Sequence, residues 1–128
     1  MKILDSVLGI HEKALQVRSQ RMELLATNIA NADTPKFKAR DVDFKQIMGA
    51  VQLDPIKTTH STHFDTAQDF GSPDGVKFRV PFNAGFDGNT VEMNVEQAQY
   101  GKAAADYRAT VMFIQSEASE MKRALRGE

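Results

Sequence analysis

The stretch LDSVLGIHEKALQVRSQRMELLATNI, residues 4–29, decides the fold of this chain. One row of its side chains recurs at alternating steps of four and three residues, which is the spacing of a helix that packs in a coiled coil. This first row consists of Leu4, Leu8, His11, Leu15, Arg18, Met22, Leu25 and Ile29. The sequence therefore predicts one long N-terminal helix.

A second row lies beside the first on the same helix. It consists of Ile3, Val7, Ile10, Ala14, Val17, Arg21 and Leu24. The two rows together are wider than the two positions in seven that a two-stranded coiled coil uses. We therefore expect the helix to contact more than one neighbour, and we expect the second row to lie exposed in the isolated chain.

Arg18 and Arg21 place positive charges within these rows. Charges at the packing positions of a coiled coil lower its stability but select its register and its partner. Alternatively, the aliphatic stems pack while the guanidinium groups reach water. The sequence leaves both interpretations open.

Both ends of the chain carry helix signals. The first helix should end near Asn31, because asparagine tolerates the left-handed backbone of a helix end and Pro35 prevents continuation. A second long helix should begin at Asn94, capped together with Gln97, and should end at Gly127. Its row with the same four-three spacing consists of Tyr100, Ala104, Tyr107, Val111, Ile114, Ala118, Met121 and Leu125.

The middle of the chain is rich in proline and glycine, so regular structure should be scarce there. The alternation of Val76, Phe78 and Val80 with polar residues predicts a half-buried strand. We expect this strand to pair with residues 90–93 as a small β-hairpin. A short helix is expected in residues 41–48.

The predicted fold is mainly α, with two long terminal helices that pair as a coiled-coil hairpin around an irregular middle. The helices occupy residues 1–33 and 94–128, and residues 34–93 form the middle segment of one domain. Within it, residues 53–72 show no periodicity and should be loose.

Composition excludes several classes of function. Sixteen basic and 17 acidic side chains give a net charge of −1, which provides no field for binding nucleic acid or an anionic membrane. The chain has no cysteine, so it forms neither disulfides nor thiolate metal sites. Asp5 and Glu12 interrupt the apolar core that a cleaved signal peptide needs, and no apolar run is long enough to span a membrane.

A metal site is the only site chemistry that the residues suggest. Its candidate ligands are His60, His63, Asp65 and Asp69. They lie in a predicted loop, where spacing fixes no common face, so a solvated polar loop is the simpler interpretation. Asp41 and Asp43 are interpreted as solvated charges. No nucleophile, phosphate loop or cofactor motif is present, so we expect no enzyme, no cofactor and no small-molecule substrate.

The densest unusual pattern follows the first helix. It runs Ala26-Thr27-Asn28-Ile29-Ala30-Asn31, followed by Thr34-Pro35 and then by Phe37 and Lys38. On physical grounds alone, the side-chain amides of Asn28 and Asn31 should donate hydrogen bonds to the unpaired backbone carbonyls at the helix end. With the continuation in residues 38–44 and the run in residues 87–91, the sequence resembles the flagellar rod, hook and hook-associated axial family, in particular its proximal rod members.

One position departs from that pattern. The family commonly has glycine just before the aromatic residue, whereas this chain has Lys36 before Phe37. If the position needs a positive φ, the lysine is strained there.

The resemblance implies a structural subunit of the basal-body rod, which crosses the periplasm. It implies export through the flagellar type III apparatus without a cleaved signal peptide. The implied partners are other rod subunits, the inner-membrane ring and rod adaptor proteins, with no nucleic acid. The family-motif positions are Asn28, Asn31, Thr34, Pro35 and Phe37.

Assembly is expected to use the terminal helices. The residues assigned to it are Leu8, Leu15, Arg18, Met22, Leu25, Ile29, Tyr107, Val111, Ile114, Ala118 and Met121. The alternative function is a helical-hairpin adaptor that binds another protein through the middle loop. Attachment to a membrane surface is disfavoured because Asp5, Glu12 and Glu23 lie on the polar face of the first helix.

Overall fold

The computed structural model describes residues 2–52 and 75–127, and of residues 2–8 and 50–52 it describes the backbone alone. Its elements, in chain order, are α1 (Lys2–Ala30), β1 (Arg40–Val42), α2 (Phe44–Gln52), β2 (Val76–Phe78) and α3 (Met93–Arg126). The mainly helical fold class is confirmed, with two long terminal helices and a small sheet. The loop expected in residues 53–72 and the four candidate metal ligands lie outside the described residues.

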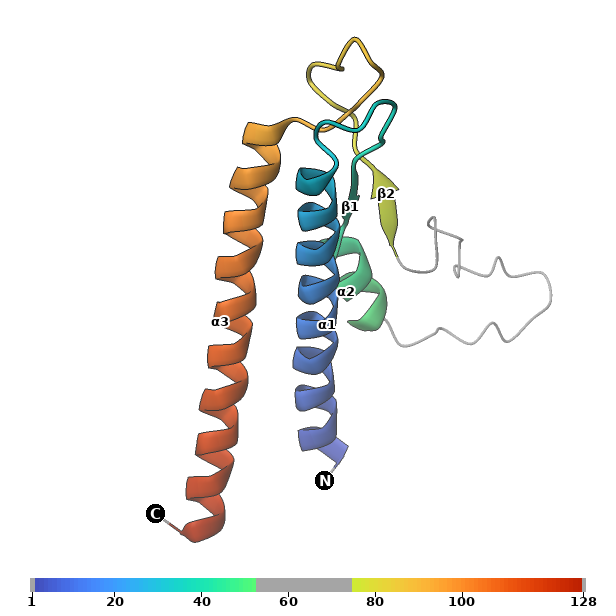
Figure 1. Cartoon of the computed structure of the whole chain (residues 1–128). Helices are drawn as coiled ribbons and strands as arrows, with labels where there is room; N and C mark the ends of the chain where they lie inside the picture. The colour runs from blue at the N-terminus through green and yellow to red at the C-terminus, as the bar shows by residue number, and fades with distance from the viewer. Residues whose placement is uncertain (1, 53–74, 128) are drawn as a thin grey trace, which may run out of the picture.

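Helices α1 and α3 lie side by side and run in opposite directions (Figure 1). Helix α2 and the two strands lie on the other side of α1 from α3 (Figure 1). Helix α1 therefore contacts α3, β1 and α2. The expectation that this helix has more than one neighbour is confirmed, and these neighbours belong to its own chain.

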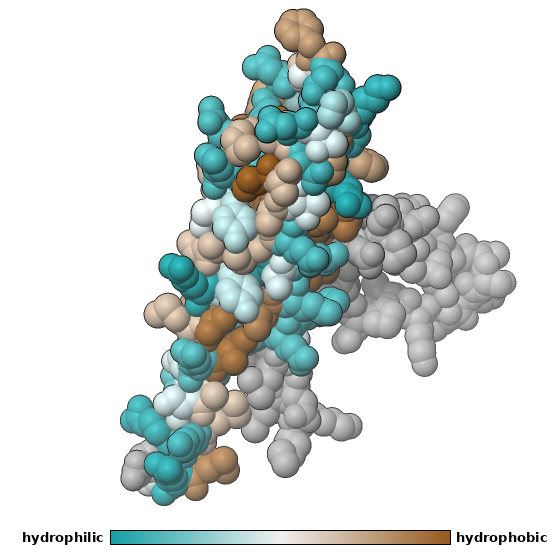
Figure 2. All heavy atoms as spheres, in the orientation of Figure 1, coloured by the Kyte–Doolittle hydropathy of each residue, from teal (hydrophilic) through white to brown (hydrophobic). Residues whose placement is uncertain are grey.

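The core lies along α1. Its apolar part consists of Ala14, Val17, Leu25, Ala39, Val42 and Ala103. The expectation that the second row lies exposed is wrong for the side chains described, because Ala14 and Val17 are buried and Ile10, Arg21 and Leu24 are half-buried. The reason is that β1 and α2 cover the part of α1 that α3 leaves free. In Figure 2 apolar side chains follow the line between the two long helices.

The sheet differs from the predicted hairpin. Strand β2 pairs antiparallel with β1, with Arg40 opposite Phe78 and Val42 opposite Val76. The residues expected to pair with β2, residues 90–93, lead into α3 instead. Sequence proximity suggested a local partner, but the side-chain alternation of β2 does not specify which strand it joins.

The helix ends follow local hydrogen bonding. The predicted short helix begins later than expected, at Phe44, because Asp41 and Val42 belong to β1. The Asp43 carboxylate accepts a hydrogen bond from the Gln46 N–H at 3.1 Å and caps α2. The predicted Asn94 cap is wrong, since Glu92 is the N-cap residue and makes no side-chain cap bond.

The C-terminal end of α3 is as predicted. Gly127 has φ 74 and donates its N–H to the carbonyls of Arg123 and Ala124. Arg123 and Arg126 lie in the last turn, where positive charge favours the helix dipole.

Leu25 tests the packing of α1, because its side chain is fully buried. Leu25→Ala should lower the free energy of unfolding by about 2–5 kcal/mol, since it removes buried methyl groups and leaves a cavity. Leu125→Ala is the matched control, because Leu125 is 89% exposed and its truncation should change stability by less than about 0.5 kcal/mol. Urea unfolding followed by circular dichroism measures both. Equal losses in the two variants would contradict the packing.

Candidate functional site: a polar junction and the exposed faces

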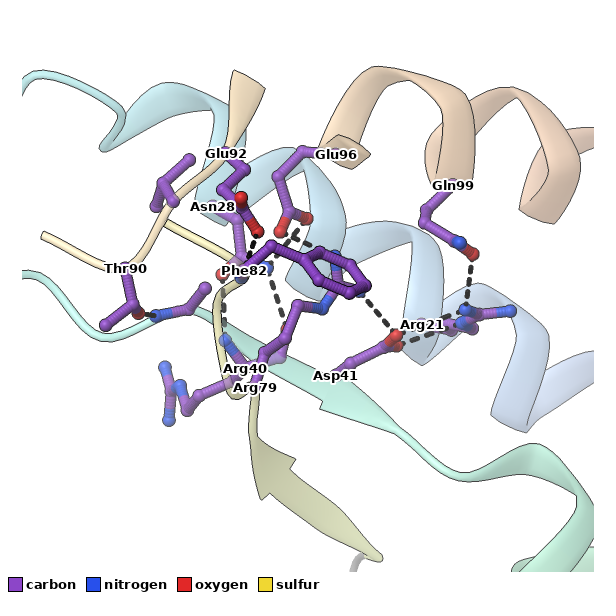
Figure 3. Close-up of polar contacts among 12 residues, drawn as sticks. Arg21, Asn28, Arg40, Asp41, Arg79, Phe82, Thr90, Glu92, Glu96 and Gln99 are labelled. Carbon is purple, nitrogen blue, oxygen red and sulfur yellow. Dashed lines mark hydrogen bonds and ion pairs between the residues drawn. The ribbon is translucent and has the colours of Figure 1, made fainter. Parts of the chain in front are cut away.

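A cluster of charged and amide side chains lies where α1, β1, the residue after β2, and α3 meet (Figure 3). We call this cluster the polar junction and define it as Arg21, Asn28, Asp41, Arg79 and Glu96. Each residue comes from a different segment except Arg21 and Asn28, which lie two turns apart on α1. The junction therefore joins every described element except α2.

Asp41 and Arg79 form the centre of the junction. Arg21 binds Asp41 with two hydrogen bonds, from Nε to Oδ1 at 2.9 Å and from Nη2 to Oδ2 at 3.1 Å. Arg79 Nη2 donates to Asp41 Oδ2 at 2.7 Å, and its Nη1 donates to Glu96 Oε1 at 2.7 Å. Arg21 Nη2 also donates to Gln99 Oε1 on α3 at 3.0 Å. These pairs connect α1 to β1, β1 to β2 and β2 to α3.

Glu96 and Asn28 complete the junction in its most buried part. The Glu96 side chain has no exposed surface, and Asn28 is 1% exposed. Asn28 Nδ2 donates to Glu96 Oε2 at 3.1 Å and to the Arg40 carbonyl at 2.8 Å, and its Oδ1 accepts from the Arg40 N–H at 3.1 Å. The Asn28 amide thus binds both backbone groups of Arg40 and fixes β1 against α1.

The charges within the junction balance, with two guanidinium groups and two carboxylates. Burial disfavours the charged form of Asp41, but hydrogen bonds from Arg21, the Val42 N–H and Arg79 outweigh it and hold the pKa of Asp41 below its ordinary value. The hydrogen bond to Asp41 in turn raises the pKa of Arg21. Paired and hydrogen-bonded in this way, the ions avoid the penalty of an isolated buried charge.

The structure corrects two interpretations of charge. Asp41 is not a solvated charge, because it pairs with Arg21 and Arg79. The guanidinium of Arg21 does not reach out to water, since its side chain is 19% exposed and bound within the chain. Arg18 lies 4.6 Å from the centre of the Phe44 ring and donates from Nη1 to the Asp106 carbonyl. Both arginines therefore tie α1 to other elements.

The end of α1 is held by a second set of hydrogen bonds, which asparagine side-chain amides donate to backbone carbonyls. Asn31 Nδ2 donates to the Thr27 carbonyl at 2.8 Å, as predicted, but Asn31 does not adopt the left-handed conformation. The buried Asn89 amide nitrogen lies within 3.0 Å of the carbonyl oxygens of Asn31, Ala32 and Thr34. The Asn28 side-chain amide donates to the Arg40 carbonyl and to Glu96 and not to a carbonyl at the helix end, which corrects the role expected for it. The run in residues 87–91 thus packs on the family motif.

Lys36 has φ 61 and is the one non-glycine residue with positive φ in residues 2–52 and 75–127. Its N–H donates to the Asp87 carbonyl at 3.1 Å, and the Thr90 N–H donates to the Phe37 carbonyl at 3.0 Å. These bonds hold the turn that follows α1 against residues 87–90. The strain expected for lysine at this position is therefore present.

The residues assigned to assembly fall into different environments. Leu25 is buried, whereas Leu15, Arg18, Met22 and Ile29 are half-buried, and the side chain of Leu8 lies outside the described residues. On α3, Tyr107, Val111, Ile114 and Met121 are half-buried and Ala118 is exposed. Among the family-motif positions, Phe37 is half-buried and Thr34 and Pro35 are exposed.

Large apolar side chains are exposed on α3, on the loop before it and at the end of β2. On α3, Met112 is 69% exposed and Phe113 63%. In residues 78–86, Phe78 is 71% exposed, Phe82 87% and Phe86 115%. By contrast, the large apolar side chains described on α1 are all buried or half-buried. The apolar surface left without cover thus lies on α3 and the loop, and the sequence rows did not single it out.

Comparison with known proteins decides the family. The family model for the flagella basal body rod protein matches residues 8–38, which include the motif at the end of α1. The flagellar basal body rod protein FlgB of Aeromonas hydrophila is 39% identical over 128 residues, covering 97% of this chain and 96% of the relative. This chain belongs to the FlgB family.

Other FlgB relatives match at similar length. The FlgB of Salmonella typhimurium is 38% identical over 97% of this chain and 96% of the relative, and that of Escherichia coli is 34% identical over 95% and 94%. The FlgB family consists of structural rod proteins and not of enzymes, in agreement with the sequence analysis. In the part of the chain that the structure describes, no helix combines the length and apolar character needed to cross a membrane.

The sequence analysis did not single out Arg79 and Glu96 in the polar junction, or Asn89 at the end of α1. Polar residues of these kinds are common where each of them lies: Arg79 at the end of a strand, Glu96 in the first turn of a helix and Asn89 in a turn. Arg21 gave the only signal in the sequence, because a charged side chain within a row of apolar ones needs an oppositely charged partner. The partner itself comes from segments far away in the sequence.

The lowered pKa of Asp41 predicts a pH dependence. Its unfolded pKa is near 3.8 and its folded pKa is lower, so the stabilisation is fully present above pH 3.8 and is lost as the pH falls through the folded pKa. Asp41→Asn should therefore lower the free energy of unfolding at pH 7, by about 1–3 kcal/mol, and the difference from wild type should shrink below pH 3.8.

Asp43→Asn is the matched control, because asparagine keeps the cap of α2, the Asp43 side chain is 47% exposed and its contact with Lys77 is 3.8 Å long, so this change should have little effect at any pH. Urea unfolding at a series of pH values measures all three proteins. A difference between Asp41→Asn and wild type that stays constant down to pH 2 would contradict the assignment.

Lys36→Gly should stabilise the protein by about 0.5–1 kcal/mol. A left-handed residue with a Cβ costs about 1–2 kcal/mol, and the added freedom of glycine in the unfolded chain offsets part of the gain. Lys102→Gly in the middle of α3 is the control and should destabilise by about 1 kcal/mol. Thermal unfolding of both variants gives the sign, and a lowered melting temperature for Lys36→Gly would refute the strain.

Proposed function

We propose that this protein is a structural subunit of the proximal rod of the bacterial flagellar basal body, where it self-assembles and transmits motor torque. The observation that carries the proposal is the apolar surface of α3 that nothing in the described chain covers. Met112 lies on the face of α3 opposite the buried Ala103 and Thr110, and Phe113 lies on the exposed flank of the helix between that face and the buried one. Membership of the FlgB family supports the same function.

Burial of this face supplies the driving force for assembly. Covering one large apolar side chain stabilises a contact by about 1.5–3 kcal/mol relative to leaving it in water. The half-buried residues Leu15, Met22, Ile29, Ile114 and Met121 add surface that neighbouring subunits can complete. Contacts between different faces of identical subunits do not close on themselves, so they build a helical tube.

The polar junction suits the subunit to carry torque. Sliding α1 along α3 would break the bonds from Asn28 to Glu96 and from Arg21 to Gln99 together. Because Asn28 and Glu96 are buried, breaking the bond between them leaves a buried amide and a buried charge without that partner. The two long helices therefore resist shear as one body.

The wider context follows from the family. The partners we propose are other rod subunits, the inner-membrane ring and rod adaptor proteins, and the type III export apparatus that delivers the chain without a cleaved signal peptide. The location is the rod that crosses the periplasm. Export requires an unfolded chain, and a small helical hairpin with a thin core unfolds readily.

Phe113→Asp should abolish rod assembly and swimming in a strain that lacks the native gene, because it places a charge in the proposed contact. The isolated variant should keep the melting temperature of the wild type, since Phe113 is 63% exposed in the folded chain. Gln115→Asp adds the same charge at an exposed site two residues later and should swim normally. Swimming assays and electron microscopy of basal bodies give the readouts.

Other results would change the conclusion. Intact rods and normal swimming in the deletion strain would remove the rod function and favour a helical-hairpin adaptor that binds through residues 34–93. Normal rods with Phe113→Asp would remove α3 from the assembly contact while keeping the protein in the rod.

A further inference from the structure

Residues 87–90 lie across the turn that follows α1, and we call these four residues the strap. Two backbone hydrogen bonds join the strap to the turn. The Lys36 N–H donates to the Asp87 carbonyl at 3.1 Å, and the Thr90 N–H donates to the Phe37 carbonyl at 3.0 Å. The strap is therefore docked on the turn at both of its ends.

Side chains add further bonds between the strap and the turn. The Asn89 amide nitrogen lies within 3.0 Å of three carbonyl oxygens at the end of α1. The Thr90 hydroxyl accepts from the N–H of Ala39 at 2.8 Å, and the Lys38 ammonium donates to the Gly88 carbonyl at 2.7 Å. Asn89, Thr90 and Ala39 are buried, and a buried polar group that loses its partner is costly. Docking of the strap is therefore favoured.

The turn under the strap is a β-turn of residues 34–37. The Phe37 N–H donates to the Thr34 carbonyl at 3.3 Å, which closes the turn. Pro35 at its second position has a fixed negative φ, and Lys36 at its third position has φ 61. A negative φ followed by a positive φ defines a type II turn, which normally has glycine or asparagine where this chain has Lys36.

The alternative for this turn is type I. Proline at the second position suits both types, and type I has a negative φ at the third position, which lysine adopts without strain. The two types differ by a flip of the peptide between Pro35 and Lys36. After the flip the Lys36 N–H would point away from Asp87, and the Pro35 carbonyl would face the Asp87 carbonyl, oxygen to oxygen. The docked strap thus excludes type I.

We propose that the Pro35–Lys36 peptide is a two-state switch that the strap sets. The docked strap holds the turn in type II, and release of the strap lets the peptide flip to the unstrained type I. The bonds of the strap therefore offset the cost of a left-handed lysine, and the strain at Lys36 in turn favours release.

Release of the strap leaves the rest of the fold connected. Asn28 binds both backbone groups of Arg40 and the Glu96 carboxylate, and Arg79 binds Glu96 as well. None of these bonds uses residues 87–90. The polar junction therefore keeps α1, the sheet and α3 together in both states, and the switch is a local change within the folded chain.

The switch links the exposed loop before the strap to the end of α1. The Gly85 N–H donates to the Asn89 carbonyl at 3.0 Å, so the loop that carries Phe86 is tied to the strap. This loop lies beyond the end of α1 (Figure 1). A force on Phe86 acts on the Lys36 peptide through the strap, and by reciprocity a change at Lys36 alters the freedom of the loop. The inference concerns the folded chain and does not rest on the rod function.

Removal of the strap's side-chain bonds tests the switch. In a chain with both Asn89→Ala and Thr90→Val, nuclear magnetic resonance should show loss of the strong cross-peak between the N–H and Hα of Lys36 that marks a positive φ. The helical circular dichroism and the slow exchange of the Leu25 amide should remain. Asn83→Ala is the matched control, because Asn83 is exposed in the same loop, and it should keep the Lys36 cross-peak.

Substitution of Lys36 provides a second test that leaves the strap unaltered. In the wild type the amides of Ala39 and Thr90 should exchange with solvent before that of Leu25, because release opens them while the helices stay folded. Lys36→Gly should slow their exchange by about 2- to 5-fold, since glycine adopts a positive φ without strain. Lys36→Ile should accelerate it, since a β-branched residue is disfavoured there.

Three outcomes would overturn the switch. A Lys36 cross-peak that persists in the strap variant would mean that the turn holds its type without the strap. Unfolding of that variant, with loss of the helical signal, would mean that the strap opens only with the whole chain. Equal protection of Ala39, Thr90 and Leu25 in the wild type would lead to the same conclusion.

Discussion

The double ion pair of Arg79, with Asp41 on one side and Glu96 on the other, is the interaction on which the rest of the structure depends. It joins the end of β2 to β1 and to α3 at 2.7 Å in each case. A core of three alanines, two valines and one leucine gives modest apolar burial, so it leaves the relative position of these segments weakly specified. Directional bonds between buried charges supply that specification.

The junction also explains why the family motif lies where it does. Asn28 binds both backbone groups of Arg40 and the Glu96 carboxylate, so one side chain of α1 positions β1 and α3 together. One turn later, the backbone carbonyl of Asn31 accepts a hydrogen bond from the side-chain amide of Asn89. The motif is therefore a docking point for two later segments of the same chain, and it holds residues 87–90 at that end of the molecule.

The division between covered and uncovered surface follows from this arrangement. Helix α1 lies in the centre with α3 on one side and α2 and β1 on the other, so its wide apolar stripe is used within the chain. Among the described helices and strands α3 packs against α1 alone, and its Met112 and Phe113 side chains stay exposed to water. In the assembly proposed above, this uncovered surface of α3 is the part of the subunit that neighbouring subunits would contact.

The two long helices and the turn after α1 could be predicted from the amino-acid sequence, because they depend on local periodicity and local backbone sterics. The sequence contained no local reason for the positive φ at Lys36, which the structure establishes. Three features became known only from the tertiary structure: β2 pairs with β1, Arg79 binds both Asp41 and Glu96, and the Asn89 amide donates hydrogen bonds to backbone carbonyls at the end of α1. These contacts join residues up to 58 positions apart, as Asn31 and Asn89 are. The identity of a single polar residue does not indicate so distant a partner, because the same residue type is equally common on a solvent-exposed surface.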